Sequence, residues 1–309
     1  MRRRTKRSDA RAIAYHYDVS NDFYALFLDR RMVYTCAYYR RPDGDLEQAQ
    51  EDKLDLVCRK LRLERGERLL DIGCGWGSLV VWAAERYGVE AHGVTLSAQQ
   101  AEYAQAAIRR AGLGGRARVD FMDYRDLPAD LRFDKVAAVG VIEHIGIANY
   151  GSYFARVHEL LTPGGLFLNH GITHEKQWHR SSQTDFLERY VFPNGEMDNV
   201  SHILDVLERA RFEILDVEGL RAHYARTTRQ WVERLQANAA RARALVSERV
   251  YRTWLTYLAA SSVAFTQGSL GLYQVVAARP DPGMREAVPT TREAIYASAP
   301  PATAARRAS

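Results

Sequence analysis

The stretch LLDIGCGWG at residues 69–77 decides the fold. It continues the short apolar run Arg68–Ile72, which predicts a buried strand. Glycines then occupy every second position up to Gly77, and residues 79–87 continue with helical spacing. A strand, a glycine turn and a helix N-terminus form a nucleotide-binding corner, because glycines let a ligand approach the backbone closely.

The glycine spacing and the residue before the turn narrow the choice of ligand. Gly-x-Gly-x-Gly differs from the Gly-x-Gly-x-x-Gly of dinucleotide sites, and no Gly-Lys-Ser/Thr follows to bind phosphate. Asp71, directly before the turn, would repel a pyrophosphate but suits a cationic ligand without phosphate. The combination resembles motif I of class I S-adenosylmethionine methyltransferases, and an ordinary strand–helix turn is the alternative.

The composition indicates a globular protein. A chain of 309 residues can form one large domain or two small ones, and 47% hydrophobic residues suffice for a packed core. The three cysteines (Cys36, Cys58 and Cys74) have no paired or metal-type spacing, which favours a reducing, cytoplasmic setting without a metal. Neither a signal peptide nor an apolar run of the roughly 18 residues of a membrane span is present, so we expect a soluble protein.

The charge distribution points to an anionic partner. The net charge is +5, and five of residues 1–7 are Lys or Arg. Such a cluster can bind nucleic acid or an anionic lipid surface, and a solvated disordered tail is the alternative. Because no zinc-ligand spacing or RNA-binding aromatic signature is present, we expect no nucleic acid. Residues 1–12 are predicted to form a basic disordered tail, and an anionic membrane surface is the predicted peripheral partner.

After the glycine turn, strand-like and helix-like segments alternate, which predicts a mostly parallel sheet with helices on both faces. The expected strands are residues 68–72, 89–95, 117–122, 135–141, 166–172, 212–217 and 270–278. The expected helices are residues 46–63, 79–87, 97–111, 150–161, 200–210, 228–245 and 248–265. A capping box of Ser97 and Gln100 opens the third helix.

These elements predict the α/β class with a Rossmann-like, seven-stranded sheet. We expect one methyltransferase domain over residues 13–280, with N-terminal helices in 13–65 and a helical or irregular substrate-side insertion at 173–198. The turn Thr162–Gly165 is expected to precede the fifth strand. Residues 281–309 are rich in Pro, Ala, Thr and Arg, which predicts a disordered tail.

Further stretches fall into one pattern with the glycine turn. They are YHYD (15–18), NDFY (21–24), YTCAY (34–38), GVTLS (93–97) with Gln100, EH (143–144), HGI (170–172), YVFPNG (190–195) and YARTT (224–228) ahead of Trp231. In joint order and spacing, from about Tyr15 to Gln274, the chain resembles the cyclopropane-fatty-acyl-phospholipid synthase family, which includes the mycolic acid cyclopropane synthases.

The resemblance implies S-adenosylmethionine as cofactor. The implied binding residues are Tyr34, Thr35, Asp71, Gly73, Cys74, Gly75, Trp76, Gly77, Thr95, Gln100, Asp123, Tyr124 and Arg125. Thr95 and Gln100 follow the second strand, where ribose hydroxyls need hydrogen-bond partners. Asp123 and Tyr124 follow the third, where an acceptor and an aromatic face suit adenine. Asp123 could equally cap a turn.

The implied reaction adds a methylene group to the cis double bond of an unsaturated acyl chain or phospholipid. The alkene attacks the sulfonium methyl group, and loss of a proton from the resulting carbocation closes a cyclopropane ring. A bound bicarbonate is implied as the base. The matching positions are Cys36, Glu143, His170, Tyr224 and the backbone of Ile172. Tyr17, Phe23, Tyr38 or Trp178 could form an aromatic wall that stabilises the cation.

Three residues depart from the family's pattern. Gly171 replaces a common Thr in His-Thr-Ile, Ser261 replaces a common Cys that we keep as a candidate catalytic residue, and Thr266 replaces a common Arg. The alternatives are methyl transfer to an alkene or an amine without ring closure, and a non-catalytic adenosyl-binding module. Cys36 could be an ordinary core residue, and His144 could serve only to orient the loop of Glu143. The sequence leaves a homodimer open.

Overall fold

The computed structural model describes Lys6 and residues 20–175, 185, 189–191, 195–281, 283 and 291–296. Its centre is one sheet with the strand order β3-β2-β1-β4-β5-β7-β6. The strands are β1 (Arg68–Ile72), β2 (Glu90–Thr95), β3 (Ala117–Phe121), β4 (Phe133–Val139), β5 (Leu161–His174), β6 (Glu213–Gly219) and β7 (Leu270–Ala278). Neighbouring strands are parallel except at β7, which is antiparallel to both β5 and β6. The predicted fold class is confirmed.

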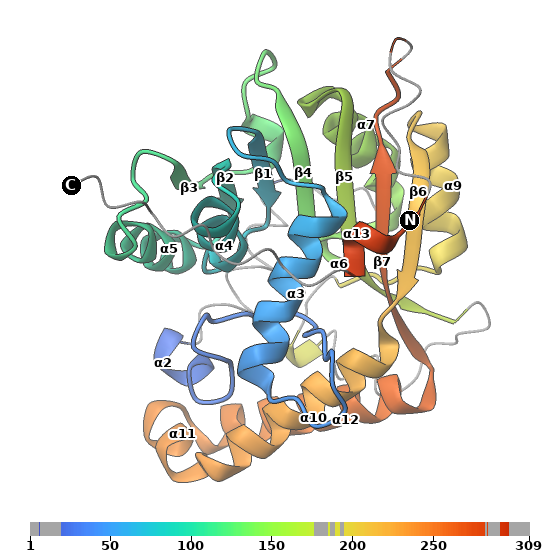
Figure 1. The fold of residues 1–309 in the computed structure, drawn as a ribbon. Coiled ribbons are helices and arrows are strands. Elements are labelled where there is room, and N and C mark those ends of the chain that lie inside the picture. Colours follow the sequence, from blue (N-terminus) through green and yellow to red (C-terminus); the bar gives the residue numbers. More distant parts are fainter. Residues whose placement is uncertain are drawn as a thin grey trace.

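Helices cover both faces of the sheet (Figure 1). On one face lie α3 (Leu46–Lys60), α4 (Ser78–Arg86) and α5 (Ala98–Arg110), and on the other lie α7 (Tyr150–Leu160) and α9 (Val200–Arg209). Because side chains alternate along a strand, β1 supplies both layers: Leu69 packs in the core with α3–α5, and Leu70 in the core with α7 and α9.

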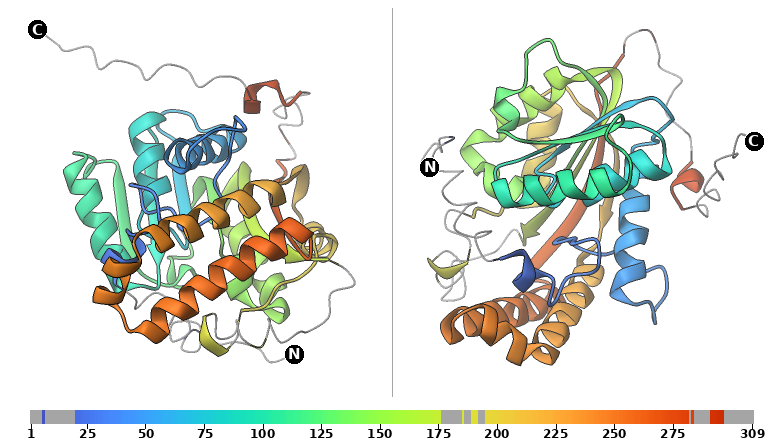
Figure 2. Two further views of the ribbon diagram at one scale, coloured as in Figure 1. Left: turned by 90° about the horizontal axis from the view of Figure 1, so that it is seen from below. Right: turned by 90° about the vertical axis from the view of Figure 1, so that its left-hand side faces the viewer.

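A third layer lies beyond the carboxyl ends of the parallel strands. It contains α10 (Arg221–Ala237), α11 (Ala239–Leu245) and α12 (Glu248–Gln267), and Figure 2 shows α10 and α12 side by side. The short helix α2 (Asn21–Tyr24) adds Phe23 and Tyr24, whose rings pack edge-to-face against Trp254 of α12. This aromatic core is separate from the two sheet cores, and it fixes a layer of helices opposite the ends of the strands.

Several predicted strand boundaries differ from the structure, and the fourth and fifth strands show the largest differences. The fourth strand ends at Val139 and not at residue 141, because Gly140 adopts a left-handed φ of 74° that breaks the extended chain. The fifth strand extends over Leu161–His174, so the start of the expected insertion lies within it. The expected turn at Thr162–Gly165 is an irregularity inside this strand: Gly164 has a φ of 77°, and the pairing with β4 passes from Leu161 directly to Leu166. Antiparallel pairing with β7 continues to His174↔Leu270, which keeps this segment extended.

The predicted helix at residues 228–245 is helical in the structure, but it starts earlier and is divided into two helices. The chain is already helical from Arg221, and α10 ends at Ala237, where Asn238 (φ −100°, ψ 20°) leaves the helical conformation before α11 begins. In the predicted tail 281–309, the described residues include the short helix α13 (Glu293–Tyr296), which packs against α3.

Some predictions fall on residues outside the described part. They are the basic tail apart from Lys6, the YHYD stretch with Tyr17, and residues 176–184, 186–188 and 192–194 of the insertion, including Trp178. No helix in the described ranges combines the length and apolar character needed to cross a bilayer.

Candidate active site

A cavity of about 490 Å³ lies between the carboxyl ends of the strands and the helices α10 and α12. Thirteen predicted site residues line it: Tyr34, Thr35, Asp71, Gly73, Cys74, Gly75, Trp76, Gln100, Glu143, His170, Ile172, Tyr224 and Ser261. Six others do not: Cys36, Gly77, Thr95, Asp123, Tyr124 and Arg125. The fold therefore brings residues from the N-terminal segment, the sheet and the third layer to one space.

The three glycines of the β1–α4 turn have different roles. All have positive φ, at 68°, 54° and 81° for Gly73, Gly75 and Gly77. A Cβ added to Gly75 would meet no atom within 4 Å, so its backbone faces open space in the cavity. A Cβ on Gly77 would lie 2.7 Å from the Cβ of Ala104, so this glycine permits close packing of α4 on α5. Gly75 is therefore the position where a ligand can approach the backbone.

Thr95 contributes to the site indirectly, by positioning the side chain of Gln100. The Thr95 hydroxyl donates to Gln100 Oε1 at 2.9 Å, and both side chains are buried. Ser97 Oγ accepts from the backbone N–H of Gln100, so half of the predicted capping box forms. The Gln100 side chain turns to Thr95 and the cavity and does not return to Ser97. Thr95 thus orients a cavity residue and does not itself line the wall.

The Asp123–Arg125 segment forms a local turn. Asp123 Oδ1 accepts from the backbone N–H of Arg125 and begins the 3₁₀ helix η1 (Tyr124–Asp126). Its second oxygen pairs with Arg125 Nη2 at 2.6 Å. This pairing and the turn hydrogen bonds hold the pKa of Asp123 below its ordinary value, against the effect of burial. The turn-cap alternative for Asp123 is therefore realised.

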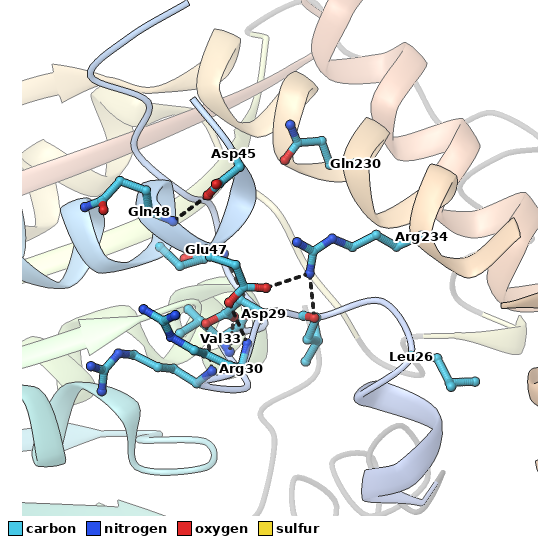
Figure 3. A network of polar contacts seen from close by, with 12 residues as sticks. Leu26, Asp29, Arg30, Val33, Asp45, Glu47, Gln48, Gln230 and Arg234 are labelled. Atoms are coloured by element: carbon cyan, nitrogen blue, oxygen red, sulfur yellow. Dashed lines mark hydrogen bonds and ion pairs between the residues drawn. The ribbon is translucent and has the colours of Figure 1, made fainter. Parts of the chain in front are cut away.

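Polar contacts fix the N-terminal segment that supplies Tyr34 and Thr35 (Figure 3). Arg234 of α10 donates from Nη1 to the carbonyl of Leu28 at 2.9 Å and to Glu47 Oε1 at 3.0 Å. Buried Asp29 accepts from the backbone N–H of Val33 at 2.8 Å. These bonds tie the segment to α3 and α10, so its cavity-lining residues stand on a fixed support.

Lys53 of α3 is a cavity residue that the sequence analysis missed. Its Nζ donates to Thr35 Oγ1 at 3.0 Å, and the residue is only 3% exposed. Burial lowers the pKa of Lys53 to about 8, although nearby acidic groups act in the opposite direction. Burial raises the pKa of Asp71 to about 7, and the charge of Lys53 counteracts part of that rise. A lysine four residues before Val57, on the apolar face of α3, was the available signal.

Glu143 lies on the short helix α6 (Ile142–Ile145) with its carboxyl group in the cavity wall. Its Oε1 accepts from the backbone N–H of Ile172 at 2.5 Å. Its buried Oε2 has no hydrogen-bond partner in the described residues. Burial raises the pKa of this carboxyl group to about 7. Glu143 is therefore a cavity-lining residue that carries one buried carboxyl oxygen with no partner among the described residues.

His170 offers the complementary group. Gln274 Nε2 donates to His170 Nδ1 at 3.1 Å, which leaves the ring proton on Nε2. Nε2 is buried and has no partner in the part of the chain that the structure describes. Burial holds the pKa of His170 well below its ordinary value, which favours the neutral ring. Two residues that line the cavity thus carry a buried polar atom without a partner in the described residues: a ring nitrogen of His170 and a carboxyl oxygen of Glu143.

The remaining residues proposed for the reacting end of the site are Cys36, Tyr224 and Ser261, and not all of them line the cavity. Cys36 is completely buried outside the cavity lining, burial raises the pKa of its thiol, and its Sγ contacts the carbonyl of Ala37 at 3.1 Å. Tyr224 lines the cavity and stacks on Phe265 at 4.5 Å. Ser261 also lines it, from α12.

The rest of the wall is mainly apolar. Met32, Leu54, Val57, Leu79, Val139, Ile147, Phe265, Leu270 and Leu272 line it. Glu196 also reaches the wall and accepts from the backbone N–H of Ile147 at 2.9 Å through Oε2, a role with no sequence signal. A mostly apolar cavity with few polar groups suits a hydrocarbon chain.

Comparison with known proteins agrees with this arrangement. The sequence profile described as mycolic acid cyclopropane synthetase matches residues 4–275. A probable fatty acid methyltransferase of Pseudomonas putida is 46% identical over 294 residues, which cover 94% of this chain and 75% of the relative.

Two solved structures extend the comparison. The cyclopropane synthase MmaA2 from Mycobacterium tuberculosis has a TM-score of 0.84 at 32% identity, with 89% of this chain and 98% of that chain covered. The mycolic acid cyclopropane synthase CmaA1, complexed with SAH (S-adenosylhomocysteine) and CTAB, has a TM-score of 0.83 at 33% identity, with 87% and 98% covered. The chain belongs to the mycolic acid cyclopropane synthetase family of S-adenosylmethionine-dependent methyltransferases that act on lipid acyl chains.

Proposed function

We propose that this protein adds a methylene group from S-adenosylmethionine to the cis double bond of an unsaturated acyl chain and forms a cyclopropane ring. The pair of unpartnered buried atoms in an otherwise apolar cavity, Glu143 Oε2 and His170 Nε2, carries the proposal. Methyl transfer to an amine needs no such pair beside the transferred carbon, whereas methyl transfer to an alkene leaves a carbocation that must lose a proton. A base beside the transferred methyl group favours loss of that proton from the methyl carbon, and the C–H electron pair can then close the ring.

The cofactor-binding part of the proposal assigns the glycine turn and its neighbours to S-adenosylmethionine. The open backbone of Gly75, the carboxyl group of Asp71 and the amide of Gln100 suit a nucleoside ligand without phosphate. When bound, S-adenosylmethionine supplies an electrophilic methyl group. The residues of this chain bind and orient that ligand beside the acyl chain, which lies against Phe265, Leu270 and Leu272.

Proton removal is assigned to a bicarbonate held by the two free groups. Bicarbonate supplies a base at the cation, and it has both an O–H and acceptor oxygens. Glu143 Oε2 would accept the O–H of the bound bicarbonate, and His170 Nε2–H would donate to one of its oxygens. The alkene carbon forms a bond to the methyl carbon as the sulfur–carbon bond breaks. The cation then loses a proton from that carbon, and the C–H electron pair closes the ring.

Methyl transfer without ring closure is the second candidate. Two observations favour it: Cys36 lies outside the cavity lining, and the N–H of Ile172 is already bonded to Glu143. Both weaken the bicarbonate set that the resemblance implies. The relative from Pseudomonas putida, described as a probable fatty acid methyltransferase, is compatible with either product. Binding to an anionic membrane, a cytoplasmic location and a homodimer stay predictions.

Isotope labelling of lipids separates the two products. The gene is expressed in a bacterium that makes no cyclopropane lipids, grown with trideuteromethyl-methionine, and the fatty acids are analysed by gas chromatography–mass spectrometry. A cyclopropane keeps two deuterium atoms and resists mild hydrogenation. A methyl branch that keeps three deuterium atoms, or an exomethylene group that is readily hydrogenated, would reject ring closure. Cells without the gene provide the background.

A further inference from the structure

Lys53 is a buried cation whose hydrogen-bonding capacity is only partly used. An ammonium group has three donors, and among the described residues this one makes a single hydrogen bond, to Thr35 Oγ1. Lys53 also lines the cavity. Burial of a charge without full pairing is costly, so a buried lysine at a cavity wall calls for an anionic partner.

Asp71 is the opposite charge on the same wall. It is 3% exposed, lines the cavity, and is near enough to Lys53 for the two charges to interact. Its carboxylate and the Lys53 ammonium nevertheless form no ion pair of 4.0 Å or less within the described residues. The cavity thus presents a separated cation and anion, which matches a ligand that carries both charges.

Lys60, on the same helix, is a buried lysine with a structural role and serves as a comparison for Lys53. It lies seven residues after Lys53 and is 1% exposed. Its Nζ lies 2.5 Å from Glu218 Oε2 and 3.4 Å from Asp216 Oδ2, so two carboxylates of β6 balance its charge. Lys60 does not line the cavity. Buried Asp29 is the acidic group that acts most strongly on Lys53, but the two form no ion pair of 4.0 Å or less within the described residues. The difference between the two lysines therefore points to a ligand as an additional partner of Lys53.

We propose that Lys53 is a cofactor-binding residue whose ammonium group binds the carboxylate of the amino-acid end of S-adenosylmethionine, with Asp71 facing the amino group. This rests on the proposed S-adenosylmethionine binding. Thr35 holds the ammonium in place, and the backbone near Gly75 leaves room for the ligand. Lys53 and Asp71 together recognise an α-amino acid, because the positive Lys53 is complementary to its carboxylate and the negative Asp71 to its amino group.

Calorimetry with two ligands tests this inference without turnover. One ligand is S-adenosylhomocysteine, and the other is its decarboxylated analogue, which keeps the amino group. The wild type should bind the ligand with the carboxylate about tenfold to a hundredfold more tightly, as expected for a charge-assisted hydrogen bond. Lys53→Met, similar in length but without charge, should remove that preference. Lys60→Met is the matched control and should keep it, even though loss of its ion pairs lowers stability.

The outcomes are distinct. Equal binding of the two ligands by the wild type overturns the role of Lys53 without the use of any variant. Equal loss of affinity for both ligands in Lys53→Met also overturns it, because Lys53 would then serve only to hold Thr35. A wild type that binds neither ligand rejects the proposed function itself. A preference that disappears in Lys53→Met and persists in Lys60→Met supports the inference.

Discussion

The glycine corner (Asp71–Trp76) and the polar wall (Glu143, His170, Ile172, Tyr224 and Ser261) line the same cavity but are built differently. The glycine corner is one continuous stretch between β1 and α4, and its shape follows from positive φ at its glycines. The polar wall takes its residues from α6, β5, α10 and α12. A site built from one stretch depends on local conformation, whereas one built from four elements depends on the packing of three layers.

This difference predicts that one substitution in the polar wall should lower the rate of the reaction and leave cofactor affinity nearly unchanged. Glu143→Gln keeps the shape of the side chain and removes the charge. We expect turnover to fall by about 10²-fold or more, the scale of a positioned acid–base group. Affinity for S-adenosylhomocysteine should stay within a few-fold, because Glu143 is assigned to the reacting end. Single-turnover kinetics and calorimetry measure the two effects, and full activity of the variant would end the proposed role of Glu143.

The glycine corner was predictable because its signals are local. Residues 68–72 form the expected strand, and the glycines after it adopt the conformation that only glycine reaches easily. The start of α10 at Arg221 and the extension of β5 to His174 were not predictable in the same way. Both involve a partner far along the chain. The pairing with β7 keeps His174 extended, and at the start of α10 the Arg221 side chain donates to the carbonyl of Phe265 at 2.6 Å.

The polar wall was identified only by family resemblance, and its geometry needed the fold. Sequence spacing does not distinguish Cys36, which points into the core, from Tyr34, which lines the cavity. It also gave no reason to separate Thr95 from Gln100, although one supports the other. Lys53 was missed because a lysine within a helix is usually a solvated residue. Only burial next to Thr35 makes it a candidate.

The departure at Gly171 offers a test of how packing supports the polar wall. A Cβ at this position would lie 2.2 Å from Cγ2 of Ile142, the residue before Glu143. Gly171→Ala should therefore lower the free energy of unfolding by about 1–3 kcal/mol, as overpacking does. Chemical denaturation measures this change.

A double-mutant cycle shows whether the clash is the cause. Ile142→Ala removes the atom in contact, so the double variant should be destabilised by less than the sum of the single changes. Additive effects would mean that Gly171 is required for another reason, such as its backbone conformation. The glycine at this position would then not depend on the side chain that precedes Glu143.

The smallest expected effect is a pH dependence that belongs to the glycine corner alone. Burial raises the pKa of Asp71 to about 7, with Lys53 as the opposing charge. A raised pKa keeps this carboxyl group neutral below pH 7, so the attraction for the ligand's amino group appears only as the pH rises through 7. Affinity for S-adenosylhomocysteine should increase about eightfold from pH 6 to pH 7.5 when the ionised carboxylate alone binds the ligand.

Variants of Asp71 and Glu143 show which of the two carboxyl groups causes the pH dependence of binding. The pKa of Glu143 is also raised to about 7 by burial, so both groups titrate in the same range. Because Glu143 belongs to the polar wall, Glu143→Gln should keep the pH dependence of binding, and Asp71→Asn should bind weakly at every pH. The measurements stop at pH 7.5, because the pKa of Lys53 is about 8 and this lysine loses its positive charge as the pH rises further. A slope that disappears in Glu143→Gln would show that the polar wall takes part in cofactor binding, and the separation of the two regions would fail.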